Sequence, residues 1–221
     1  MRAPKSGVRR GRIIAVSLGL LLTVCTALSL RLGSVWMDTQ SFWGGLLSLP
    51  GFETPRVILY SLRLPRLIAA LLAGIGLSLS GVLLQRVTNN DLASPNIIGV
   101  NAGAGFSVML CLCFAPRAVS ALPFAAFAGA FGTTLLILAL SRRLGASKTA
   151  LVLCGVACTT VFQAGISFLT LLDTDALVSY SAFSMGGLSG VTLRQLAIPA
   201  VLIALCLLMS RIFAGKINTL C

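Results

Sequence analysis

The sequence predicts an all-α membrane protein whose helices cross the bilayer several times. Of its 221 residues, 57% are hydrophobic and only 10% are charged, and the mean hydropathy is +1.00. Soluble domains are about 45–50% apolar and about a quarter charged. The chain therefore lacks the polar surface that a soluble fold of this length needs, and its long apolar runs are suited to contact with lipid.

Six stretches are long enough to cross the hydrocarbon core, which takes about 20 mainly apolar residues. We expect spans at 13–30, 67–84, 97–114, 119–140, 149–172 and 193–210. The basic segment 1–12 resembles the start of a signal peptide, but the apolar run after it is long and no small-x-small cleavage site follows. We therefore expect one transmembrane domain over 1–221, with 1–12 as its basic cytoplasmic N-terminus.

The orientation follows from the 17 Lys and Arg residues, which outnumber the 5 Asp and Glu residues. If the N-terminus is cytoplasmic, 11 of the 17 fall in cytoplasmic segments and 6 fall outside. Such an excess is typical of the cytoplasmic side of membrane proteins. Topology thus explains the net charge of +12, and we expect no nucleic acid partner because no basic patch is interleaved with aromatic residues.

Small residues mark the second and third spans. Gly74 and Gly81 lie in the second span, while Gly99 and Gly103 form a GxxxG pattern in the third and are followed by Gly105. Glycines at helical spacing let two helix backbones approach closely. We expect these positions to pack helices into a bundle, and a role in lining a transport pathway stays open.

The spans also lack the groups that many chemistries need. No Asp, Glu, Lys or Arg lies in the interior of a predicted span, the sequence has no histidine, and no GxxxxGK[ST] motif is present. Ion-coupled transporters usually carry ionisable groups at membrane depth, and ATP-binding sites need the phosphate-binding loop. We therefore expect no enzyme activity, cofactor or metal, and Cys154 and Cys158 are interpreted as small apolar residues, with a soft-metal pair as the alternative.

One ordered motif extends from residue 62 to residue 105. It reads Leu-Arg-Leu-Pro-Arg at 62–66, Ser-Gly-Val-Leu-Leu-Gln at 80–85 and Asn-Asp-Leu-Ala-Ser-Pro at 90–95, followed by the glycines of the third span. This string resembles the FecCD/BtuC-like permease family, whose pattern is L-R-x-P-R, then S-G-x-x-x-Q, then N-P-L-A-x-P-x-x-x-G-x-x-x-G-A. The motif positions outside the arginines and glycines include Pro65, Gln85, Ala93 and Pro95. Asp91 departs from the family, which often has proline there.

The resemblance continues downstream. Leu153–Ala157 is similar to the opening of the family's fifth span, Met185-Gly186-Gly187-Leu188 to the short helix and turn before the sixth, and Asn218-Thr219-Leu220 to the cytoplasmic segment after it. The resemblance implies a BtuC-like permease bundle that ends after the first six or so of about ten spans. We interpret Asp173 and Asp175 as a solvated outer turn without chemistry.

The resemblance implies roles for two groups of residues. Arg63 and Arg66 would dock acidic residues of an external substrate-binding protein through charge-assisted bonds. The alternative is that both arginines only anchor the helix at the membrane interface. A cytoplasmic gate would comprise Asn90 and Leu92 with a second pair, Lys148 and Thr149. Lys148 replaces the small polar residue of the family, and an ordinary capped turn over 90–95 is the alternative.

The resemblance also implies a function and partners. The chain would be the permease subunit of a binding-protein-dependent ABC importer in the bacterial plasma membrane, paired with a second permease copy or a paralogue and driven by cytoplasmic ABC ATPase subunits. We expect a ferric siderophore as cargo, with haem or cobalamin as alternatives. Two other classes stay open: a truncated fragment that cannot transport, and a passive channel or scaffold.

Overall fold

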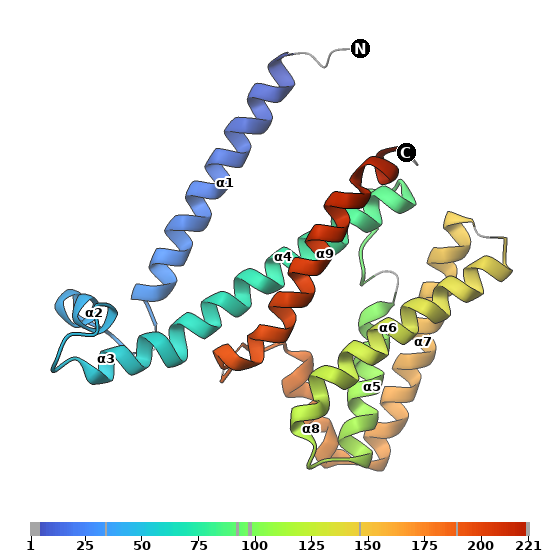
Figure 1. Cartoon of the computed structure of the whole chain (residues 1–221). Helices are drawn as coiled ribbons and strands as arrows, with labels where there is room; N and C mark the ends of the chain where they lie inside the picture. Colours follow the sequence, from blue (N-terminus) through green and yellow to red (C-terminus); the bar gives the residue numbers. More distant parts are fainter. Residues whose placement is uncertain are drawn as a thin grey trace. The chain divides into compact units, whose positions relative to one another are not determined.

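All regular secondary structure is helical in the part of the chain that the computed structural model describes, residues 5–33, 35–91, 93–96, 99–145, 147–188 and 190–219. Figure 1 shows the helices in chain order. They are α1 (Lys5–Arg31), α2 (Thr39–Leu46), α3 (Glu53–Val57), the π-helix η1 (Ile58–Arg63), α4 (Leu64–Thr88), α5 (Val100–Phe114), the 3-10 helix η2 (Val119–Ala121), α6 (Leu122–Arg143), α7 (Lys148–Leu172), α8 (Thr174–Ser184) and α9 (Leu193–Thr219). The all-α prediction is confirmed.

Among the described residues, five helices are long and apolar enough to cross a membrane. They cover Arg9–Arg31, Glu53–Thr88, Val119–Arg143, Lys148–Leu172 and Leu193–Gly215. Each contains one predicted span or nearly all of it. Their mean hydropathy is 1.8 to 2.4 over the best 18-residue window, so apolar length alone located them.

The predicted third span differs from the structure. Helix α5 begins at Val100 and has 15 residues, about 22 Å of helix against a hydrocarbon core of about 30 Å. Gly99 before it has a φ of 85°, a left-handed conformation that ends helical continuity. Residues 97 and 98, where the prediction placed the start, lie outside the described residues.

The chain forms two compact units. One contains the chain up to Gly74 together with Leu188–Leu205, and the other contains Ile75–Gly187 together with the chain from Cys206 onward. In the first unit, α2 packs on α3 through two buried glycines, and a Cβ on Gly45 would lie 2.9 Å from the carbonyl carbon of Pro55. The Tyr60 hydroxyl donates to the Leu46 carbonyl at 3.0 Å, which ties η1 to the end of α2.

The second unit is built around α5, which packs against α6, α7 and α8 (Figure 1). Val108 and Met109 of α5 are fully buried, and the core around them includes Leu112, Leu169 and Ala176. Burial of α5 by three neighbours explains why its hydrophobic residues show no one-sided pattern.

Asp173 is the single residue between α7 and α8 and caps the start of α8, and Asp175 is exposed in the first turn of that helix. The solvated turn that was predicted at 173 and 175 therefore also begins a helix. The Asp173 Oδ1 accepts hydrogen bonds from the backbone amides of Asp175 and Ala176, each at 3.0 Å. A carboxylate at the N-cap satisfies amides that have no partner inside the helix. Helix α8 then ends at Ser184, and Gly186 follows with a φ of 67°.

Candidate functional site

Arg63 binds the end of another helix instead of projecting into solvent. Its Nη1 donates to the carbonyls of Leu30 and Arg31 at 2.6 and 2.8 Å, and its Nη2 donates to the Val35 carbonyl at 2.6 Å. The first two carbonyls belong to the last turn of α1, where carbonyls have no partner within the helix. The half-buried guanidinium therefore caps α1.

Arg66 lies three residues further along and is exposed on the first turn of α4. Pro65 between the two arginines is fully buried. The two arginines of the motif thus have different surroundings. Arg66 presents its charge at the surface, whereas Arg63 already donates to three carbonyl oxygens.

The end of α4 is closed by a tight turn. Asn89 has a φ of 48°, its amide donates to the Arg86 carbonyl at 3.2 Å, and the Asn90 amide donates to the Gln85 carbonyl at 3.1 Å. A left-handed residue with a bond reaching back five positions is a common way to end a helix. This turn sets the direction in which the chain leaves α4.

The Gln85 side chain holds the loop that follows. Its Nε2 donates to the Asp91 carbonyl at 2.9 Å, the Ala93 amide donates to the Asn90 carbonyl at 3.1 Å, and Ala93 is buried. Asn90 is exposed. Leu92, the other predicted gate residue on this loop, lies outside the described residues.

The far end of the loop is fixed against α7. The Val100 backbone amide donates to the Pro95 carbonyl at 3.3 Å, and the side-chain Nδ2 of Asn101 donates to Oδ1 of Asn96 at 3.0 Å. Gly99 is buried against α7, because a Cβ there would lie 2.7 Å from the Gly155 carbonyl oxygen. The Cβ would also overlap the Thr159 hydroxyl, and because the Gly155 carbonyl belongs to the backbone it cannot turn aside, so only glycine fits.

The predicted packing glycines fall into two groups. A Cβ on Gly103 would overlap Thr133 of α6 and lie 3.1 Å from the Gly129 carbonyl, and one on Gly105 would lie 2.8 Å from the Tyr180 hydroxyl. A Cβ on Gly74 or Gly81 would meet nothing within 4 Å. Close helix packing is thus found at Gly103, opposite Gly129 of α6, and at Gly105, opposite Tyr180 of α8. Gly129 was not among the predicted packing positions.

Lys148 and Thr149, the second predicted gate pair, form the first turn of α7 and are both exposed. The Ser147 side chain accepts a hydrogen bond from the Ala150 amide at 3.0 Å and caps the helix. Gly187, from the downstream motif, is exposed in the segment after α8. The structure fixes the backbone of the pair and leaves its side chains accessible.

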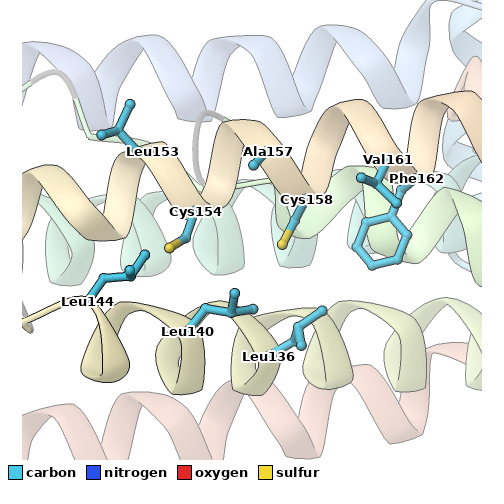
Figure 2. A pocket seen from close by; sticks show the side chains of 9 residues that line it. All are labelled: Leu136, Leu140, Leu144, Leu153, Cys154, Ala157, Cys158, Val161 and Phe162. Atoms are coloured by element: carbon cyan, nitrogen blue, oxygen red, sulfur yellow. The ribbon is translucent and has the colours of Figure 1, made fainter.

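An apolar groove of about 500 Å³ lies between α6 and α7. Figure 2 shows the thiols of Cys154 and Cys158 directed from α7 toward α6. The groove is lined by Leu136, Leu140, Leu144, Leu153, Cys154, Ala157, Cys158, Val161 and Phe162. Within the described residues no three His, Cys, Asp or Glu side chains gather closely enough to hold a metal.

Comparison with known proteins extends over nearly the whole chain. Residues 21–221 match the model of the FecCD transport family. The Fe(3+)-citrate import system permease protein YfmE of Bacillus subtilis is 32% identical, with 86% of this chain and 57% of YfmE covered. The vitamin B12 import system permease protein BtuC of Vibrio cholerae is 33% identical, with 84% and 56% covered.

Two further similarities agree with these. The iron(3+)-hydroxamate import system permease protein FhuB of Bacillus subtilis is 34% identical, with 82% of this chain and 48% of FhuB covered. A solved structure, described as an inward-facing metal-chelate type ABC transporter, superposes with a TM-score of 0.78 at 28% identity, with 95% of this chain and 64% of the other covered. The chain thus spans about half to two thirds of the length of these proteins.

Proposed function

Because the chain belongs to the FecCD transport family, we propose that it serves as a permease subunit of a binding-protein-dependent ABC importer. The match over residues 21–221 to a transport family, with import permeases among its relatives, carries this proposal. The proposed partners are two cytoplasmic ABC ATPase subunits, an external substrate-binding protein and a second permease copy or paralogue. The proposed location is the bacterial plasma membrane, with the N-terminus in the cytoplasm.

The proposed cargo is a ferric siderophore or a similar iron(III) chelate. The matched relatives include permeases for Fe(3+)-citrate and iron(3+)-hydroxamate, which support this choice, and others for vitamin B12. The interiors of the predicted spans contain no Asp, Glu, Lys or Arg that could bind a coupling ion, so the energy would come from the ATPase subunits.

Uptake assays test the cargo and the function together. Cells with and without the native locus would be given ⁵⁵Fe-citrate, a ⁵⁵Fe-hydroxamate and labelled cobalamin. Loss of uptake of one iron chelate on deletion, with restoration by the intact locus, is expected. Loss of cobalamin uptake alone would mean that the cargo is cobalamin and not an iron chelate. Unchanged uptake of all three would favour a truncated fragment that cannot transport. Uptake that survives ATP depletion would indicate a passive channel.

Replacement of Arg66 by glutamate is expected to weaken docking of the substrate-binding protein. Arg66 is exposed on α4, and reversing its charge removes an attraction and adds a repulsion. We expect affinity to fall roughly tenfold, which is about 1.4 kcal/mol, with a weaker dependence on salt. Surface plasmon resonance with the loaded binding protein measures both. Arg142→Glu, an exposed arginine at the end of α6, is the control, and equal losses for both variants would refute a specific role.

Replacement of Gln85 by leucine is expected to loosen the proposed gate loop. The change leaves the Asp91 carbonyl without the amide that now binds it at 2.9 Å, a loss of about 1 kcal/mol. Uptake should fall several-fold while the amount of protein in the membrane stays constant, and amide exchange over 89–96 should rise. Gln163→Leu, at an exposed position on α7, is the matched control. Unchanged exchange in Gln85→Leu would show that the side chain does not hold the loop.

A further inference from the structure

Helix α1 makes little contact with the rest of its unit. Its large apolar side chains are exposed, including Leu20 at 68% and Val16 at 72%. Its main packing contact within the described part of the chain is with η1, near its C-terminal end (Figure 1). Whatever holds this end therefore determines where the first membrane span stands relative to η1.

Two arginines hold this end of α1. The Arg63 guanidinium donates hydrogen bonds to two carbonyls of the last turn of α1 and to the Val35 carbonyl beyond it. Arg31, the last residue of α1, donates from Nη2 to the Thr39 hydroxyl at 2.8 Å, at the start of α2. Arg63 is the more consequential of the two, because a cation opposes the negative end of the helix dipole and its planar group reaches three acceptors at once.

Gly33 makes room for this arrangement. A Cβ on Gly33 would lie 3.0 Å from Nη2, 3.1 Å from Cζ and 3.2 Å from Nε of Arg63. Any side chain at position 33 would therefore press on the guanidinium. Because Gly33 carries no charge, substituting it can disturb the Arg63 contacts while leaving every arginine in place.

We infer that Arg63 is a positioning residue that fixes α1 and the segment after it on η1, and that Arg66 carries the docking charge of the motif. A carboxylate arriving at Arg63 would have to compete with three carbonyl oxygens, each within 2.8 Å. Arg66, by contrast, is exposed on the first turn of α4. The second half of this inference rests on the proposed function, and the first half does not.

Arginine-specific labelling tests the first half without any partner protein. The full chain in lipid nanodiscs would be treated with phenylglyoxal, and the modification rates of Arg63 and Arg66 compared by peptide mass spectrometry. Arg63 is expected to react at least tenfold more slowly. In Gly33→Val the Arg63 rate should rise toward that of Arg66, whose own rate should not change. Equal rates in the parent protein would overturn the inference.

Conservative replacement separates a positioning role from a docking charge. Lysine keeps the positive charge but has one nitrogen, which cannot occupy the places of both Nη1 and Nη2. Arg63→Lys and Gly33→Val should both raise amide exchange in Leu28–Leu32 several-fold, while Arg66→Lys leaves it unchanged. In the docking assay, Arg63→Lys and Gly33→Val should preserve the salt dependence that Arg66→Gln reduces.

Two results would contradict the inference. One is parent-like exchange in Arg63→Lys, and the other is a reduced salt dependence in Arg63→Gln equal to that in Arg66→Gln. If the binding protein fails to bind even the parent chain, the proposed docking function fails, whereas the labelling and exchange results still decide the role of Arg63.

Discussion

Replacement of Gly103 by valine is expected to separate α5 from α6 and to destabilise the second unit by about 3 kcal/mol or more, the upper range for overpacking a core. The first added carbon would overlap the buried Thr133 side chain and lie 3.1 Å from the Gly129 carbonyl. In the reverse direction, a Cβ on Gly129 would lie 2.5 Å from the Gly103 carbonyl. Two backbones also meet here, so turning the Thr133 side chain aside would still leave the added carbon against the Gly129 carbonyl.

Thermal unfolding in detergent, followed by circular dichroism, measures the loss, and the yield of folded protein in the membrane should fall with it. Gly132→Val is the matched control, because Gly132 lies three residues after Gly129 on α6 and a Cβ there would meet nothing within 4 Å. Gly129→Val should behave like Gly103→Val. If Gly132→Val lowers the free energy of unfolding as much as Gly129→Val does, valine destabilises α6 itself. The close contact between α5 and α6 would then not explain the loss.

The membrane-crossing helices were predictable because their signal is local. A run of about 20 apolar residues requires lipid or burial whatever surrounds it, and α1, α4, α6, α7 and α9 each contain such a run. The start of α5 was missed for a local reason of another kind. The stretch from 97 to 114 is mainly apolar, but Gly99 adopts a left-handed conformation that hydropathy does not encode.

For contacts between helices, the sequence indicated the glycines on one helix but not the residues that they meet on its partner. The GxxxG spacing identified Gly99 and Gly103, but it contains no information about the partner. Gly129 and Gly132 are both small residues on α6, and only the three-dimensional rotation of the helix places Gly129 against α5. Gly81 was expected to pack like the others, yet in the described structure a Cβ on it would meet nothing within 4 Å.

The arginine pair shows the same limit. Residues 62–66 read Leu-Arg-Leu-Pro-Arg, and this pattern predicts the same docking role for both arginines. The carbonyl of Leu30, which binds Arg63, lies 33 positions earlier in the sequence. A capping contact over such a separation depends on how α1 meets η1, so no spacing rule within the motif could distinguish Arg63 from Arg66.

Replacement of Gly99 by alanine is expected to displace the α4–α5 loop from α7 and to lower uptake at least tenfold. Two separate costs add at this position. A left-handed φ, here 85°, costs a residue with a side chain about 1–2 kcal/mol. The methyl group would also lie 2.7 Å from the Gly155 carbonyl oxygen, which cannot easily move because the Thr159 hydroxyl donates to it at 2.8 Å.

Gly186→Ala isolates the first of these costs, since Gly186 has a φ of 67° but a Cβ there would meet nothing within 4 Å. Subtracting its loss of unfolding free energy from that of Gly99→Ala leaves the cost of the contact with α7. Amide exchange over 89–96 should rise only in Gly99→Ala. Equal losses of unfolding free energy in the two variants would mean that backbone strain accounts for the whole effect of Gly99→Ala. A larger loss at Gly99, with faster exchange and reduced uptake, would mean that α7 holds the loop in the position that transport requires.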